Sequence, residues 1–153
     1  MKVKILFLSI IMTFVVGCSE KVPTFAEQVC QGKYANIMVK TEPLYVRTAC
    51  QQDELAHGLK NIKKMDYDVG MLFVFGYEKP LSFWMKDTYI PLDIAFLNDK
   101  LEIVDIQTMK PFDETEVKSS KPASYALEVN KGYFQKYNIK IGDKISLINK
   151  VSN

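Results

Sequence analysis

The sequence contains a single histidine, His57, and a single tryptophan, Trp84. One histidine cannot form a histidine-rich zinc site, and it leaves a Ser-His-Asp triad with only one candidate base. The chain also lacks a C-x-x-C pair, a G-x-S-x-G motif and a glycine-rich loop of the kind that holds phosphate. We therefore predict no metal and no cofactor, and no motif assigns a catalytic residue.

An excess of one charge is also missing. The 153 residues include 20 Lys or Arg and 18 Asp or Glu, a formal net charge of +2. Without an N-terminal segment carrying Lys2 and Lys4, 18 basic residues remain against 18 acidic ones, and the net charge is zero. Nucleic-acid affinity depends on basic residues that neutralise phosphates. We therefore predict no nucleic-acid partner.

Long apolar runs are absent except at the N-terminus. Ile5–Val16 is apolar apart from two hydroxyl residues and follows the basic Met1–Lys4. It has the length of a signal-peptide core and is too short to span a bilayer. The run ends at Gly17-Cys18, which resembles the lipobox of bacterial lipoproteins, where the cysteine is acylated and cleavage falls just before it. We predict a signal peptide over residues 1–17 and a lipid such as palmitate on Cys18; an ordinary signal or an uncleaved anchor are the alternatives.

This interpretation places the protein in the bacterial cell envelope. It would be attached to a membrane through Cys18 and would face the periplasm or the exterior. Acylation by two or more chains holds a protein more firmly than one chain, because each buried methylene adds about 0.8 kcal/mol.

The cysteines are few, and their number is odd. If Cys18 carries a lipid, Cys30 and Cys50 remain as a pair. A disulfide between them would close a loop of about twenty residues and stabilise the fold by roughly 3 kcal/mol. Two separate thiols or a redox pair are the alternatives, although the spacing is not that of a redox motif. We predict a structural disulfide.

The apolar pattern predicts one small domain. Residues 18–43 are predicted to form the lipidated N-terminus, a tether and a short helix, and residues 44–150 a single β-rich domain. Short apolar runs separated by turn residues favour a compact α+β fold, in which a mostly antiparallel sheet curls toward a barrel and carries two or three short helices. Strands are expected at 44–49, 70–75, 82–88, 92–97 and 124–129. A hairpin turn is expected at Asn98-Asp99 within 97–106, and a last strand follows a turn at Gly142-Asp143 within 140–148. Short helices are expected at the start of 24–38, where Gly32 limits the helix, and at 51–59 and 133–137.

Three stretches of the sequence resemble a known family. GMLFVF, FWMKDTYIPLDIAFL and ALEVNKGYFQKYNIKIGDKI are similar to the family called domain of unknown function 192, over about Val46 to Leu147. The resemblance implies a compact β-rich domain, often secreted or lipid-anchored, and it implies no chemistry. The chain departs from the family pattern at two places: HGLK replaces the usual RGLM at 57–60, and Asp87 stands where FWMKNT has an amide.

The stretch SFWMKDTYIPLD is the candidate site. If 82–88 is a strand, Phe83 and Met85 face the core, and the alternate residues form an aromatic and cationic surface. Such a surface is suited to a sugar ring or an anionic group. The candidate ligand-binding residues are Trp84, Lys86, Asp87, Thr88 and Asp93.

Three interpretations of these residues remain open. In the first, Lys86 pairs with Asp93 or Asp87 and only fixes the strand register. In the second, the five residues line a shallow pocket for a small polar ligand. In the third, two carboxylates act as acid and base, as in glycoside hydrolysis. Asp93 must be solvated or hydrogen-bonded, and Glu128, within the apolar run 124–129, is expected to be satisfied by backbone or lysine.

The function that fits these expectations is a non-catalytic accessory lipoprotein that binds a small ligand or an envelope protein. The alternative is a hydrolase acting on an envelope carbohydrate, which requires two carboxyl groups facing one cleft. A weaker possibility is an assembly factor whose edge strand pairs with a partner.

Overall fold

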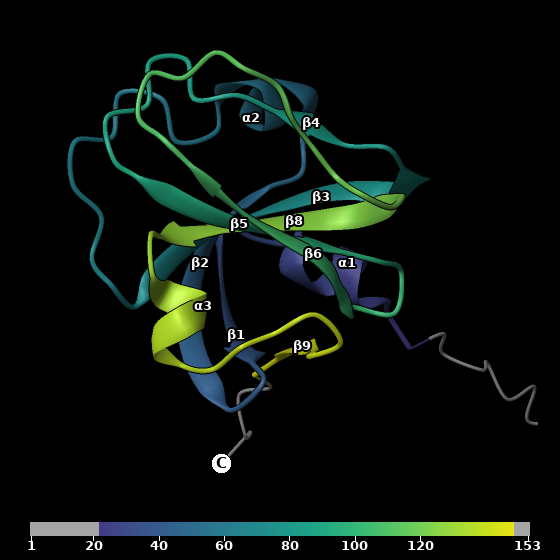
Figure 1. Ribbon diagram of the computed structural model, residues 1–153. Helices are drawn as coiled ribbons and strands as arrows, with labels where there is room; N and C mark the ends of the chain where they lie inside the picture. Colours follow the sequence, from purple (N-terminus) through teal and green to yellow (C-terminus); the bar gives the residue numbers. More distant parts are fainter. Residues whose placement is uncertain (1–21, 149–153) are drawn as a thin grey trace, which may run out of the picture.

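The computed structural model describes residues 22–148, so the predicted signal peptide and Cys18 lie outside the described part. This part forms a seven-stranded sheet in the order β6-β5-β8-β3-β2-β1-β9, with a separate two-stranded sheet, β4-β7 (Figure 1). The strands are β1 Tyr34–Val39, β2 Glu42–Ala49, β3 Val69–Lys79, β4 Ser82–Phe83, β5 Leu92–Leu97, β6 Ile103–Met109, β7 Val117–Lys118, β8 Ala123–Asn130 and β9 Ile145–Leu147. The helices are α1 Phe25–Val29, α2 Gln52–His57 and α3 Tyr133–Lys136.

The large sheet is mostly antiparallel and strongly curled. Among the described strands, only β2 and β3 pair in parallel. The two ends of the sheet meet through backbone hydrogen bonds: Ile145 donates to the Leu101 carbonyl at 3.0 Å, and Ile103 donates to the Asp143 carbonyl at 2.9 Å. The predicted α+β class, with an antiparallel sheet curled toward a barrel and short helices, is confirmed.

The sheet separates two apolar cores because its central strands are buried on both faces. All six residues of β5 are buried, and so are residues 123–129 of β8, as expected for continuous apolar runs. One core includes Ile37, Val46, Leu72 and Leu127 and is covered by α1, α3 and β9. The other includes Met71, Phe73, Ile94 and Phe96 and lies under α2, β4 and the loops around them (Figure 1).

The predicted disulfide joins α1 to the sheet. Cys30, directly after α1, is bonded to Cys50, directly after β2, and their Cα atoms lie 6.0 Å apart. Helix α1 begins at the cap Thr24, whose hydroxyl accepts a hydrogen bond from the Glu27 amide at 3.2 Å. The prediction of a structural Cys30–Cys50 bond is confirmed.

The folded domain begins earlier than the predicted boundary at residue 44. Strand β1 (34–39) pairs with β2 on one side and with β9 on the other, so it belongs to the main sheet. Its first three residues are exposed or half-buried, which weakens the sequence pattern that would have indicated a strand. None of the helices within residues 22–148 has the length and apolar character needed to cross a membrane.

Candidate ligand-binding site

The segment predicted as one strand over 82–88 is mostly a turn. Only β4 (82–83) is a strand, paired with β7. After it, the amide of Thr88 donates to the carbonyl of Met85 at 3.1 Å and closes a four-residue turn. The third residue of this turn, Asp87, has φ of +57°. Apolar and polar residues alternate in a short strand, and they can alternate in the same way in such a turn. The strand prediction was therefore wrong beyond Phe83.

The conformation of Asp87 explains the amide that is usual at this position in the resembling family. A turn with positive φ at its third residue is best served by Gly or Asn, and Asp is also tolerated there. Asp87 is exposed, and its backbone carbonyl accepts a hydrogen bond from the amide of Asn61 at 2.9 Å. This position therefore favours a residue that tolerates the left-handed conformation. The backbone hydrogen bond between Asn61 and Asp87 links the turn to the loop after α2.

The side chains of the turn divide between core and surface. Met85 is buried in the core under α2 and β4, and Phe83 packs against the same core. Trp84 is 49% exposed, and Lys86 is exposed as well. Thr88 was expected beside them on the surface but is buried, and its hydroxyl donates to the carbonyl of Lys86 at 3.3 Å.

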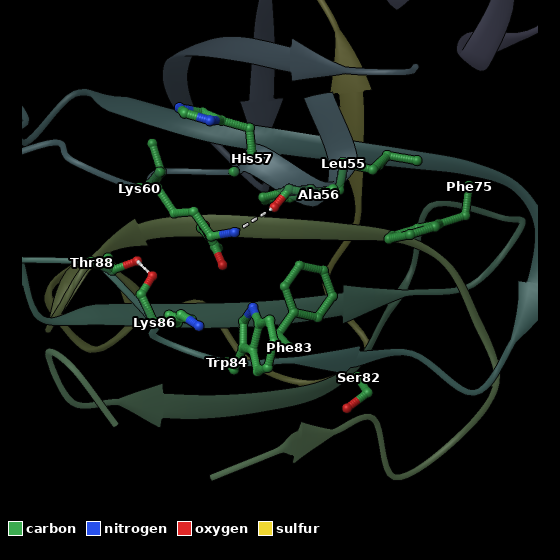
Figure 2. A pocket seen from close by; sticks show the side chains of 14 residues that line it. Leu55, Ala56, His57, Lys60, Phe75, Ser82, Phe83, Trp84, Lys86 and Thr88 are labelled. Carbon is green, nitrogen blue, oxygen red and sulfur yellow. Dashed lines mark hydrogen bonds between the residues drawn. The ribbon is translucent and has the colours of Figure 1, made fainter. Parts of the chain in front are cut away.

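A pocket of about 290 Å³ opens beside Trp84. We call it the Trp84 pocket (Figure 2). Residues 55–60, from the end of α2 and the following turn, form one wall, and the segment 82–88 forms the opposite one. The phenyl rings of Phe73 and Phe75 on β3 complete the apolar lining together with Phe83; the Phe73 and Phe83 rings meet edge to face at 5.0 Å. Of the predicted site residues, Trp84, Lys86 and Thr88 line this pocket.

Two ammonium groups lie over the indole at the pocket. The Nζ atom of Lys60 is 5.9 Å from the centroid of the Trp84 ring, and the Nζ atom of Lys86 is 5.8 Å from it. Lys60 also donates to the carbonyl of Ala56 at 3.1 Å, as Figure 2 shows. Within residues 22–148 neither lysine forms an ion pair, so the predicted pairing of Lys86 with Asp87 or Asp93 is not formed. Two cations at one aromatic ring leave an unneutralised positive rim.

Glu128 of β8 also lines the Trp84 pocket. It is only 4% exposed, and it has no hydrogen-bond or ion-pair partner in the described part of the chain. Burial raises the pKa of this carboxyl from near 4.5 to about 8. The expectation that backbone or a lysine satisfies Glu128 is therefore wrong. At neutral pH the pocket contains a mostly protonated acid with no partner of its own.

Asp93 is buried at a different place. One carboxylate oxygen accepts from the Thr108 hydroxyl on β6 at 2.7 Å, and the other accepts from the Gly132 amide at the start of α3, also at 2.7 Å. Of the two alternatives expected for this aspartate, solvated or hydrogen-bonded, the structure shows the second. Asp93 does not line the Trp84 pocket, and neither does Asp87. The two hydrogen bonds of Asp93 link β5 to β6 and to the start of α3.

The carboxyl groups do not form the pair that glycoside hydrolysis requires. Asp93 is opposite Val129 in the β5–β8 register, whereas Glu128 is opposite Ile94. Adjacent register positions point to opposite faces of a sheet, so the Asp93 and Glu128 side chains lie on different sides of it. Among residues 22–148, no group of three or more His, Cys, Asp or Glu side chains is placed to hold a metal ion.

Among the residues that line the pocket, sequence reasoning missed the charged residues Lys60 and Glu128. Both come from segments remote from Trp84 in sequence, and no local pattern links them to it. A signal existed for each. Lys60 stands where the RGLM pattern of the resembling family has methionine, and Glu128 is the only charged residue of the buried strand β8.

The fold and the site define a small β-rich domain with an apolar pocket, a cationic rim and a buried acid. The family described as Uncharacterized ACR, domain of unknown function 192, matches residues 35–147, and the chain belongs to this family. Comparison with functionally curated proteins finds no match.

The solved structures that are similar to this chain include two bacterial proteins. One, from Sinorhizobium meliloti 1021, carries a provisional description as a transcription regulator; it is 30% identical, with a TM-score of 0.70, and the match covers 74% of this chain and 92% of that one. The other is a protein of unknown function from Novosphingobium aromaticivorans DSM 12444. It is 29% identical, with a TM-score of 0.71, and the match covers 74% of this chain and 84% of that one.

Proposed function

We propose that the protein is an envelope lipoprotein whose β domain binds a small anionic ligand in the Trp84 pocket without transforming it. The observation that carries the proposal is the meeting of Lys60 and Lys86 over the indole of Trp84. These lysines come from different elements, and neither has an ion-pair partner among the described residues. Two unneutralised ammonium groups on one side of an apolar pocket favour a ligand that brings negative charge to its mouth.

The size of the pocket supports a small ligand. Binding pockets for drug-sized molecules begin at roughly 300 Å³, and the Trp84 pocket has about 290 Å³. The phenyl rings of Phe73, Phe75 and Phe83 offer an apolar wall, while the lysines and the Thr88 hydroxyl supply a few polar contacts. A few polar groups in an apolar pocket are typical of sites that orient a ligand.

The hydrolase alternative has no such support. It depends on two carboxyl groups that share one cleft, and Glu128 is the one carboxyl group that lines the Trp84 pocket within residues 22–148. Asp93 is engaged with Thr108 and Gly132 on the other side of the sheet. Binding without chemistry is therefore the function that the pocket supports best.

Anion binding can be tested through Trp84, because it is the only tryptophan in the chain. Ethyl phosphate and inorganic phosphate should change the indole fluorescence in a saturable way. Lys60→Gln and Lys86→Gln should each weaken this binding about tenfold, as expected for the loss of one charge-assisted contact of about 1.4 kcal/mol. The matched control is Lys63→Gln, because Lys63 lies over Tyr89 at 5.8 Å and does not line the pocket. The proposal fails if no anion changes the fluorescence, or if all three variants bind alike.

The anchor can be tested separately. Cys18→Ser should release the protein from the membrane fraction and abolish its labelling by radioactive palmitate, because the serine hydroxyl cannot replace the thiol in lipid attachment. Lys21→Gln, next to the same segment, should leave both the labelling and the membrane attachment intact. Palmitate incorporation into the Cys18→Ser protein would contradict the lipoprotein assignment and would leave the ligand proposal untouched.

A further inference from the structure

Glu128 is a buried carboxyl group with no partner of its own. It is 4% exposed and yet lines the Trp84 pocket, and nothing within residues 22–148 bonds to it. Buried polar groups in native structures are almost always paired, so an exception that faces a pocket indicates a group supplied from outside. The question is which chemical group suits this carboxyl.

The acidic and basic side chains occupy different parts of the Trp84 pocket. On β3 and β5 the register neighbours of Glu128 are Met71 and Ile94, which are uncharged. The titratable side chains that line the pocket from the other elements are His57, Lys60 and Lys86, and Figure 2 shows the His57 ring directed away from Trp84. Among the described residues, the pocket thus combines one acid in its interior with two cations beside the indole.

Aromatic rings line the same pocket as the acid. Phe73 and Phe83, with ring centroids 5.0 Å apart, line the same pocket as Glu128. Aromatic faces attract an ammonium group, and a carboxylate beside them adds a direct ion pair. A ligand anion would be repelled by an ionised Glu128, and a simple cation would be repelled by the two lysines. A molecule that carries both a positive and a negative group can pair with Glu128 and with the two lysines.

We propose that the Trp84 pocket binds a small zwitterion, whose ammonium group pairs with Glu128 at the aromatic lining while its phosphate or carboxylate group contacts Lys60 and Lys86. This inference rests on the proposed anion site and adds the group recognised at its inner end. The volume of about 290 Å³ fits a molecule in which a few bonds separate the two charges.

Proton release should accompany binding. The pKa of Glu128 is about 8 because of burial, so the carboxyl is mostly protonated at pH 7 in the free protein. An ammonium group favours the ionised form, and binding therefore expels a proton. The affinity for a ligand with an ammonium group should rise with pH up to about 8, relative to the affinity for a ligand without it.

The test compares phosphoethanolamine with ethyl phosphate, which lacks the ammonium group, by calorimetry and Trp84 fluorescence on the full chain. Phosphoethanolamine should bind at least about tenfold more tightly than ethyl phosphate to the wild-type protein, equivalent to about 1.4 kcal/mol. In Glu128→Gln this ratio should approach one. The wild-type ratio should also increase by up to about fiftyfold between pH 6 and 8, because the ionised fraction of a carboxyl with a pKa of about 8 rises from about 1% to about half over this range; this measurement needs no variant. The ammonium group lowers the second phosphate pKa of phosphoethanolamine relative to that of ethyl phosphate, so each affinity is expressed per phosphate dianion before the ratio is taken.

The outcomes separate the two proposals. If ethyl phosphate binds as tightly as phosphoethanolamine at every pH, the zwitterion proposal is overturned and the anion site stands. If the ratio is high but survives in Glu128→Gln, the role of Glu128 is overturned. If neither probe binds, both proposals fail. Vesicles of phosphatidylethanolamine identify the source of the ligand: capture of the Cys18→Ser protein on them, lost in Lys60→Gln, indicates a lipid headgroup, and binding of the free probe alone indicates a soluble metabolite.

Discussion

Between about pH 4.5 and about pH 8, the wild-type protein is expected to lose stability relative to Glu128→Gln, by on the order of 5 kcal/mol in the free energy of unfolding. Below pH 4.5 both the folded and the unfolded chain hold the Glu128 proton. As the pH rises, the unfolded chain releases this proton first, because burial raises the folded pKa to about 8. The unfolded state is therefore favoured progressively, by about 1.4 kcal/mol per pH unit, until the folded carboxyl also ionises.

Urea unfolding of the two proteins across this pH range measures the effect. Other carboxyl groups act in the opposite direction: backbone hydrogen bonds, for example, lower the pKa of Asp143 and Asp113, so their contribution is lost at acid pH. These groups are present in both proteins and cancel in the difference. Glu114→Gln is the matched control, because Glu114 is exposed, and its stability curve should follow that of the wild type. A difference between wild type and Glu128→Gln that does not change with pH would show that Glu128 ionises as easily in the folded state as in the unfolded one.

The loss of stability expected from Glu128 suggests that this residue has a function. Leucine would fill a core position on β8 without any pH-dependent loss, since all residues of β8 up to Val129 are buried. Sequence features that oppose stability are typical of functional sites. The binding of an ammonium group at Glu128 would supply the reason, and added phosphoethanolamine should then recover part of the stability that the wild type loses near pH 8.

The parts of the fold that could be predicted from the sequence are those with a distinct local pattern, such as a continuous apolar run. Strands β3, β5 and β8 are central in the sheet, so both faces are buried and the apolar run is continuous. Strand β1 has only its last residues well buried, and its pattern did not distinguish it from the end of the preceding helix. The segment after β4 was predicted to be a strand because a turn with buried Met85 between exposed Trp84 and Lys86 gives the same alternation.

Only those site residues that are close together in the sequence could be predicted. Trp84 and Lys86 are neighbours in sequence, and their placement on one surface follows from alternation along the chain. Lys60 reaches the same indole through the turn after α2, and Glu128 reaches the pocket from β8 through the pairing of β8 with β3. These two contacts depend on the tertiary arrangement. Asp93 is the last residue of the stretch SFWMKDTYIPLD, but its side chain lies on the opposite face of the sheet from that of Glu128, because each strand alternates its side chains between the two faces.

Replacing both Cys30 and Cys50 by alanine is expected to lower the free energy of unfolding by about 3 kcal/mol. The bond links residues 20 apart and so restricts the unfolded chain over a loop of that length. It also holds α1 against the sheet, where Val29 is buried and the Phe25 ring meets the Tyr125 ring edge to face at 5.6 Å. The measurement is denaturant unfolding, with every protein carrying Cys18→Ser so that no third thiol can exchange.

Reductant separates this effect from the loss of the cysteine side chains themselves. Dithiothreitol should destabilise the parent protein by nearly the same amount as the double substitution, whereas the Cys30→Ala/Cys50→Ala protein should not respond to it. Equal unfolding free energies for the oxidised parent and the double variant would mean that the bond contributes nothing to stability. If the loss is as large as expected, the folded domain is substantially more stable in an oxidising compartment than in a reducing one, as is appropriate for the envelope location proposed from the lipobox.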